Sequence, residues 1–136
     1  MAITSLLLLY ICGATLGVSI PAGRWLAMTG LILIALLPFA ALGITLGHLI
    51  NVDSVGALTG GVVSILAFLS GTWFPLTHGF LYDIGQYNPG YWIVRASHIA
   101  LHGHGWSTKG WVVVGAWTVV LVVLARAAYR RDTQRV

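Results

Sequence analysis

The chain has 136 residues, of which 58% are hydrophobic and only 7% are charged. About a quarter of the residues in a soluble domain are charged, so this composition excludes an ordinary soluble globular protein. The net charge of +4 does not indicate a nucleic-acid partner, because four of the seven basic residues lie in the tail 126–136, directly after an apolar stretch. A basic tail in that position is typical of a membrane protein.

Charged residues occur at the edges of long uncharged apolar stretches. A charge near the middle of a membrane helix costs about 2.5–3.5 kcal/mol on insertion scales, so charges collect at the ends of spans. A helix needs about 20 residues to cross the hydrocarbon core of a bilayer. The sequence therefore predicts an all-α integral membrane protein with four transmembrane helices, at about 2–20, 25–50, 54–75 and 110–129.

The first apolar stretch has no basic leader before it, so it is predicted to be a span rather than a cleavable signal peptide. A turn at Pro21–Arg24 leads into the second span, where Pro38 removes a backbone hydrogen bond and is expected to kink the helix. Glycine pairs four residues apart in the first three spans favour close helix packing. These pairs are Gly13 and Gly17, Gly43 and Gly47, and Gly56 and Gly60.

The short connection between the second and third spans contains polar residues that favour a helix start. Asp53 or Ser54 is expected to cap the first N–H groups of the span 54–75. Short connections make consecutive spans antiparallel, so four spans place both termini on the same side of the cell membrane. The basic tail 126–136 predicts that this side is cytoplasmic.

The third connection, 76–109, is too long for a turn and too apolar for a solvated loop. Aromatic side chains, which collect at the level of lipid headgroups, are concentrated in and beside it. We expect it to form two short re-entrant or interfacial helices on the extracellular side, at about 76–86 and 90–102. The predicted break between these two helices is at Asn88 and Pro89.

Three histidines, His98, His102 and His104, are the strongest candidates for metal ligands. Residues four apart lie on one face of a helix, and imidazole binds zinc, copper and haem iron. No cysteine or carboxylate is close in sequence to complete a site, so no bound metal is predicted. A membrane metal or haem protein using His98 and His102, with His48 or His78, remains an alternative, as does a membrane scaffold subunit without transport activity.

Several short motifs follow one another in a fixed order. They are Phe-Ala-Ala-Leu-Gly at 39–43, Leu-Gly-His-Leu-Ile at 46–50, Ser-Val at 54–55, Phe-Leu-Ser-Gly-Thr-Trp-Phe-Pro at 68–75 and Asn-Pro at 88–89. In this order they resemble the carboxy-terminal half of the membrane subunit of a type-two ATP-binding cassette exporter. That family includes the permeases of bacterial multidrug efflux, which confer antibiotic resistance, and of polysaccharide export across the cell inner membrane.

The resemblance implies roles for three groups of residues. In the family, the Ser-Gly-aromatic-aromatic-Pro motif closes the fifth of six spans at the outer face, two short re-entrant helices follow, and a sixth span returns to a basic cytoplasmic tail. The candidate outer gate is therefore Ser70, Gly71, Trp73, Phe74 and Pro75. The candidate re-entrant break is Asn88 and Pro89, and the candidate ATPase-contact turn is His48, Asn51 and Asp53.

The resemblance also implies partners. The chain is expected to be a transport subunit and not an enzyme, to bind no cofactor itself, and to work with an ATPase subunit that binds ATP and Mg²⁺. A second copy of the permease, or a homologous subunit, is expected to complete a dimer. The chain corresponds to spans three to six of the family, so we expect a truncated permease that performs little ATP-driven transport by itself, and its substrate is expected to be drug-like, lipid-linked or a polysaccharide.

Overall fold

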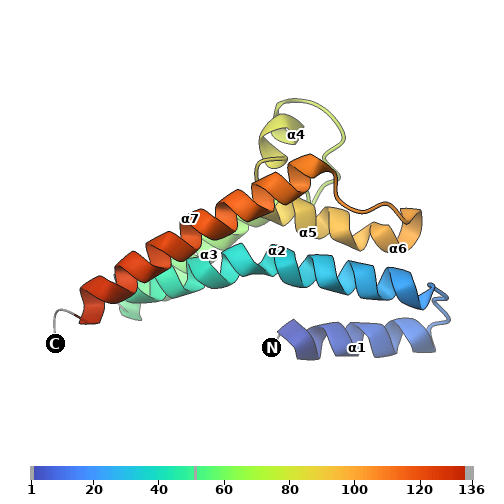
Figure 1. The fold of residues 1–136 in the computed structure, drawn as a ribbon, viewed down its shortest axis with the longest axis horizontal. Helices are drawn as coiled ribbons and strands as arrows, with labels where there is room; N and C mark the ends of the chain where they lie inside the picture. The colour runs from blue at the N-terminus through green and yellow to red at the C-terminus, as the bar shows by residue number, and fades with distance from the viewer. Residues whose placement is uncertain (1, 51, 134–136) are drawn as a thin grey trace.

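The computed structural model describes residues 2–50 and 52–133, and within them it contains helices and no strand. The predicted all-α fold class is therefore confirmed. The helices are α1 (Ala2–Thr15), α2 (Ala22–Leu49), α3 (Val52–Leu69), α4 (Phe80–Gly85), α5 (Pro89–Ser97), α6 (Ile99–His102) and α7 (Thr108–Thr133) (Figure 1).

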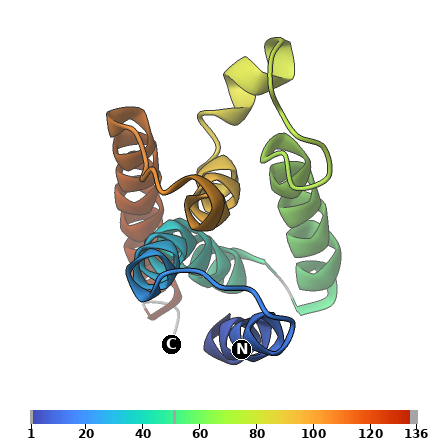
Figure 2. The same cartoon turned by 90° about the vertical axis from the view of Figure 1, so that its right-hand side faces the viewer.

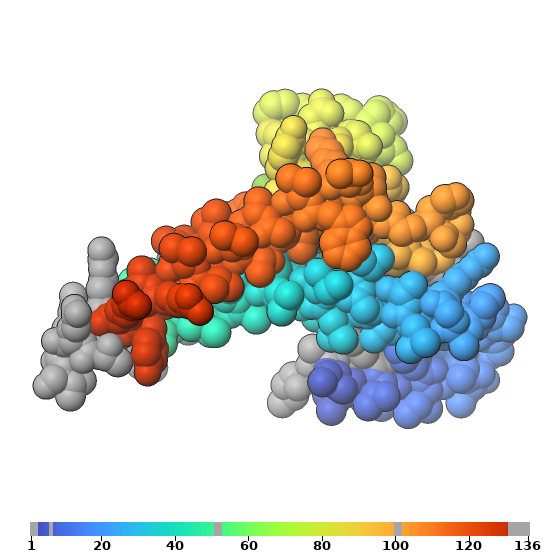
Figure 3. All heavy atoms as spheres, viewed as in Figure 1, coloured from blue at the N-terminus to red at the C-terminus, as the bar shows by residue number. Residues whose placement is uncertain are grey.

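Helix α2 is the centre of the arrangement. It packs most extensively against α7 and next against α5, while α3 packs against α2 and α5. Viewed end-on, α7 and α3 lie on opposite sides of α2 and α5 (Figure 2). The segment from the end of α3 through α4 projects away from the long helices (Figure 3). Pro38 is buried inside α2, and the helix changes direction near its middle, in agreement with the predicted kink (Figure 1).

The buried core lies where α2, α5 and the first half of α7 meet. Small residues admit large aromatic rings there: Ala35 of α2 is completely buried, and a Cβ at Gly110 of α7 would lie 2.5 Å from Cε3 of Trp92. Only a glycine therefore allows α7 to approach the Trp92 ring this closely. The core cluster is Ala35, Tyr91, Trp92, Ala96, Trp106, Val113 and Val114.

Two helices, α2 and the Thr108–Arg130 part of α7, are long and apolar enough to cross a membrane. Only 22% and 17% of their most apolar windows are buried, whereas the core helix of a soluble protein is mostly buried. Large apolar side chains on them, such as Leu37 and Val119, are more than half exposed. The sequence predicted four such helices, and residues 2–50 and 52–133 contain two.

The other two predicted spans are shorter because glycines end their helices early. Helix α1 stops at Thr15, not at residue 20, because Gly17 adopts a φ of 79° and the Val18 N–H bonds back to the Gly13 carbonyl at 3.0 Å. Helix α3 stops at Leu69, not at residue 75, because Gly71 adopts a φ of 77°. A left-handed glycine after the last turn is a common way to terminate a helix. Both endings correct the predicted span boundaries.

The connection between α3 and α7 contains short helices, as predicted, but with different boundaries. The expected pair at 76–86 and 90–102 is replaced by α4, α5 and α6, with His98 joining α5 to α6. Pro89 does not lie in a break, because it occupies the first turn of α5, where its missing N–H costs nothing. Gly103, with a φ of 72°, ends α6.

Helix α1 lies beside the N-terminal half of α2 and is attached to it at one place (Figure 1). The Tyr10 and Trp25 rings meet edge-to-face with centroids 4.4 Å apart, and the Tyr10 hydroxyl is hydrogen-bonded to Thr29. These contacts link the first two helices through aromatic and hydroxyl groups, and Gly13 of the first predicted glycine pair lies against the Trp25 ring, with its Cβ position 3.6 Å from Cη2.

Candidate functional site

The segment after α3 forms one wall of a pocket against α5. Its turn begins at Gly71, where a Cβ would lie 3.2 Å from the Phe74 carbonyl oxygen and 3.2 Å from Cγ of Leu76. The pocket has a volume of about 340 Å³. We name it the turn pocket and define it by residues 70–77 together with Tyr91, Val94, Arg95 and His98.

All five candidate outer-gate residues line the turn pocket. Ser70 is buried, whereas the Trp73 and Phe74 side chains are 72% and 61% exposed. Phe74 meets Phe68 of α3 edge-to-face, with ring centroids 6.0 Å apart. Trp73 and Phe74, the aromatic pair of the motif, are therefore on the surface, whereas the polar Ser70 at the start of the same turn is buried.

Ser70, at the end of α3, packs directly against the start of α5. Its hydroxyl donates to the Ala67 carbonyl at 2.6 Å and lies 2.5 Å from the Thr72 hydroxyl. A Cβ at Gly90 would come within 2.9 Å of the Ser70 Cβ. The two helix ends are therefore in direct contact, and the glycine makes that contact possible.

Asn88 joins the same two helices by hydrogen bonds. Its Oδ1 accepts from the Gly90 N–H at 3.0 Å, which caps α5, and its Nδ2 donates to the Leu66 carbonyl at 2.6 Å. In a continuing helix that carbonyl would accept from the N–H of Ser70, but the Ser70 N–H bonds to Ala67 instead. One buried amide therefore satisfies an unpaired group at the start of α5 and another at the end of α3.

Sequence reasoning did not place Tyr91, Arg95 and His98 in this site. Their spacing of four and three residues puts them on one face of α5. The Arg95 guanidinium carbon lies 5.7 Å from the Tyr91 ring centroid. Burial raises the pKa of the Tyr91 phenol above its ordinary value, against an opposing effect of Arg95, so the phenol remains neutral. The helical spacing was the signal that could have identified this face.

The turn between α4 and α5 is held by α7. Lys109 donates to the Gln86 side-chain carbonyl at 2.7 Å and lies 4.5 Å from the Tyr87 ring centroid. The Trp92 indole donates to the Gln86 carbonyl at 2.9 Å, and the Trp117 indole donates to the Tyr87 carbonyl at 2.7 Å. These bonds fix the site to the helical core, and no sequence pattern predicted them.

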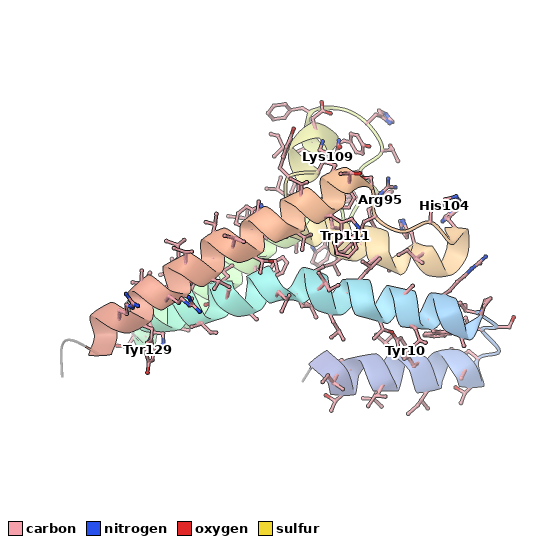
Figure 4. The ribbon with its side chains drawn as sticks, in the orientation of Figure 1. Tyr10, Arg95, His104, Lys109, Trp111 and Tyr129 are labelled. Carbon is pink, nitrogen blue, oxygen red and sulfur yellow. The ribbon has the colours of Figure 1, made fainter. Side chains whose placement is uncertain are left out.

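The candidate ATPase-contact turn lies at the other end of α2. His48 meets Tyr129 of α7 edge-to-face, with ring centroids 5.6 Å apart, and Tyr129 lies near the carboxy-terminal end of α7 (Figure 4). Asp53 is exposed. Because α3 begins at Val52, Asp53 and Ser54 lie inside the helix and not at its cap, which corrects the predicted capping position. Asn51 lies outside the described residues.

The histidines do not gather into a metal centre. The His98 and His102 rings have centroids 6.3 Å apart, and His102 Nδ1 lies 3.3 Å from the His98 carbonyl oxygen. His78 is exposed and hydrogen-bonded to Thr77, and His48 is at the far end of α2. Within the part of the chain that the structure describes, no three His, Cys, Asp or Glu side chains are grouped to hold a metal ion.

The structure thus brings two of the three predicted groups together. The outer-gate residues and the Asn88–Pro89 pair form one unit around the start of α5, and the turn after α2 lies apart from them. No protein-family model, no curated protein and no solved structure matches the chain, so its function is argued from this geometry.

Proposed function

We propose that the chain is a membrane-spanning part of an ATP-binding cassette exporter permease. The observation that carries this proposal is the hydrogen bond from Asn88 to the Leu66 carbonyl. This bond joins α3 to the start of α5, and the Ser-Gly-Thr-Trp-Phe-Pro turn that follows α3 lines a pocket against α5. In the family that the sequence resembles, the same motif closes a span at the outer face and is followed by short re-entrant helices. The order and the packing of α3, the turn, α4 and α5 agree with that arrangement.

The apolar surface supports a place in the bilayer. Helix α2 has 28 residues and is about 42 Å long, more than the roughly 30 Å hydrocarbon core. Helices α3 and α1 are shorter, about 27 Å and about 21 Å long, and a bilayer accommodates a short span by local thinning. All four helices expose large apolar side chains along their length. We infer that α1, α2, α3 and α7 are the four spans and that α4, α5 and α6 lie in the outer interface.

The two ends of the long helices differ in charge. The turn after α2 and the carboxy-terminal end of α7, with Arg126 and Arg130, lie together at one end (Figure 1). The positive-inside rule assigns that end to the cytoplasm, and with it the surface that would contact the ATPase subunit. Both termini are then cytoplasmic, and ATP and Mg²⁺ are bound by the partner.

Transport in this scheme uses conformational change and no covalent chemistry. A path between this chain and a second permease copy would open alternately to the two sides of the membrane, driven by ATP bound on the partner. The exposed Trp73 and Phe74 on the Gly71 turn would close the path at the outer face. The buried Ser70 and Asn88 would hold the turn in place.

The proposal is tested first by the composition of the native complex. When the chain is purified from its own membrane in mild detergent, we expect an ATP-hydrolysing subunit with a phosphate-binding G-x-x-x-x-G-K-[ST] loop to purify with it in about equal amount. We also expect ATP hydrolysis by that complex to be inhibited by vanadate. Purification of the chain with no such subunit and no such hydrolysis would contradict an exporter function.

The proposed orientation is tested by cysteine labelling. Cys12 is the only cysteine, so Cys12→Ser provides a background in which single cysteines are introduced. In intact cells, a membrane-impermeant maleimide should label His104→Cys and not Arg126→Cys, because the two residues lie at opposite ends of the helices. Both variants should react after the cells are permeabilised. Labelling of Arg126→Cys but not of His104→Cys in intact cells would show that the true orientation is the reverse of the proposed one.

A further inference from the structure

A second pocket lies on the other side of Arg95 and His98 from the turn pocket. It has a volume of about 280 Å³ and is formed where α5, α6 and the start of α7 come together. Arg95 and His104 lie at this end of the molecule (Figure 4). We name it the cationic pocket; its polar lining is Arg95, His98, His102, His104 and Ser107.

The cationic pocket gathers positive charge without a balancing acid. Arg95 is permanently charged, the three imidazoles carry N–H donors, and no Asp or Glu is among the lining residues. Ser107 directly precedes α7, whose first N–H groups carry the positive end of a 26-residue helix dipole. Arg24 of α2 is a further cation near the end of α6, with Nη2 3.3 Å from the position of a Cβ on Gly103.

The nearby charges on the packed elements do not cancel this field. Tyr91 lies beneath Arg95, where burial keeps the phenol neutral. Lys109 on α7 is directed to Gln86 and Tyr87. The walls of the pocket include the buried Trp92 and Trp106 rings, so a polar anion would sit above an apolar floor.

We propose that the cationic pocket binds a phosphate or sulfate group. Arginine, imidazolium and a helix N-terminus are the groups that proteins use for oxyanions. The volume lies just below the range of drug-sized sites, which suits a headgroup rather than a whole drug molecule. Two sources share this chemistry: the headgroup of an anionic lipid and a soluble phosphorylated or sulfated molecule. The inference does not depend on an exporter function, because it concerns binding by this chain alone.

The first experiment titrates sulfate into the purified chain in dodecylmaltoside micelles. Because Trp92 and Trp106 line the pocket, binding should change the intrinsic fluorescence saturably. Arg95→Gln should weaken binding about tenfold, since it removes a charge-assisted bond, and Arg95→Lys should retain most of the affinity. Arg126→Gln, the same change at the opposite end of the molecule, should have no effect.

The second experiment identifies the source of the group. Nanodiscs of phosphatidylcholine with and without phosphatidylglycerol are compared by native mass spectrometry for lipid retained by the chain. Retention of phosphatidylglycerol that Arg95→Gln abolishes assigns the pocket to a lipid headgroup, and sulfate binding without such retention assigns it to a soluble anion. The double variant His98→Gln/His102→Gln is a second test of the pocket in case Arg95→Gln does not fold. The proposal is overturned if circular dichroism shows either variant folded and that variant binds the probes as the unaltered chain does. It is also overturned if the unaltered chain binds neither sulfate nor phosphatidylglycerol.

Discussion

Replacing Asn88 with alanine should lower the free energy of unfolding by about 2–4 kcal/mol. The change removes the cap of α5, worth about 0.5–2 kcal/mol, and leaves the Leu66 carbonyl without its partner, at a cost of about 1–3 kcal/mol. Asn88 is only 5% exposed, so water does not replace the lost bonds freely. Unfolding in detergent micelles, followed by far-ultraviolet circular dichroism, measures the effect.

A second substitution separates the two bonds of Asn88. Asn88→Ser keeps a side-chain acceptor for the Gly90 N–H but is too short to reach the Leu66 carbonyl. We expect it to recover the capping share of the loss and no more. Equal stability of the unaltered chain and Asn88→Ala would show that the amide does not join α3 to α5, and the proposed anchoring of the turn would be wrong.

Replacing Gly71 with leucine should reduce export at least tenfold while leaving membrane insertion intact. The left-handed conformation at Gly71, with a φ of 77°, costs a side-chain-bearing residue about 1–2 kcal/mol. A Cβ would also press on Cγ of Leu76 and on the Phe74 carbonyl oxygen at 3.2 Å. The turn that carries the exposed aromatic pair would therefore be displaced from α5. ATP-dependent export of a lipophilic dye such as Hoechst 33342, measured in the complete transporter that contains this segment, checks the result.

Two controls accompany the Gly71 variant. Gly61→Leu places the same side chain on α3 where a Cβ meets no atom within 4 Å, so it should transport normally. Gly71→Asn should retain part of the activity, because asparagine tolerates the left-handed region better than leucine does. Normal efflux by Gly71→Leu, present in the membrane at the normal level, would show that the Gly71 turn is not part of the gate.

The positions of the helices followed from charge and hydropathy, whereas their ends did not. Uncharged stretches bounded by charges located all four long apolar segments, because burying or inserting a charge is expensive. Hydropathy contains no information about backbone conformation, so the helix ends before Gly17 and Gly71 were not predicted. Both glycines follow a helical segment directly, and the preference of glycine for this position was the available signal.

The candidate site was only partly visible in the sequence for a related reason. The Ser-Gly-Thr-Trp-Phe-Pro turn and the Asn-Pro pair are compact motifs, and both proved to belong to one site. The contacts that assemble it join residues far apart in the chain: Asn88 to Leu66 across 22 positions and Trp117 to Tyr87 across 30. Single-sequence patterns carry no information about such pairs, and no motif marked Arg95 as part of a site.

The amide of Asn88 also has a mechanical consequence. Because it fixes the end of α3 to the start of α5, these two helices cannot slide independently at the turn pocket. Helix α3 then acts as a lever about 27 Å long, whose Asp53 end lies at the same end of the molecule as the carboxy-terminal end of α7 but on the other side of α2, and whose other end leads into Gly71 (Figure 1, Figure 2). A small tilt imposed at the Asp53 end would be delivered to Trp73 and Phe74 as a displacement of the whole turn, with α5 carried along.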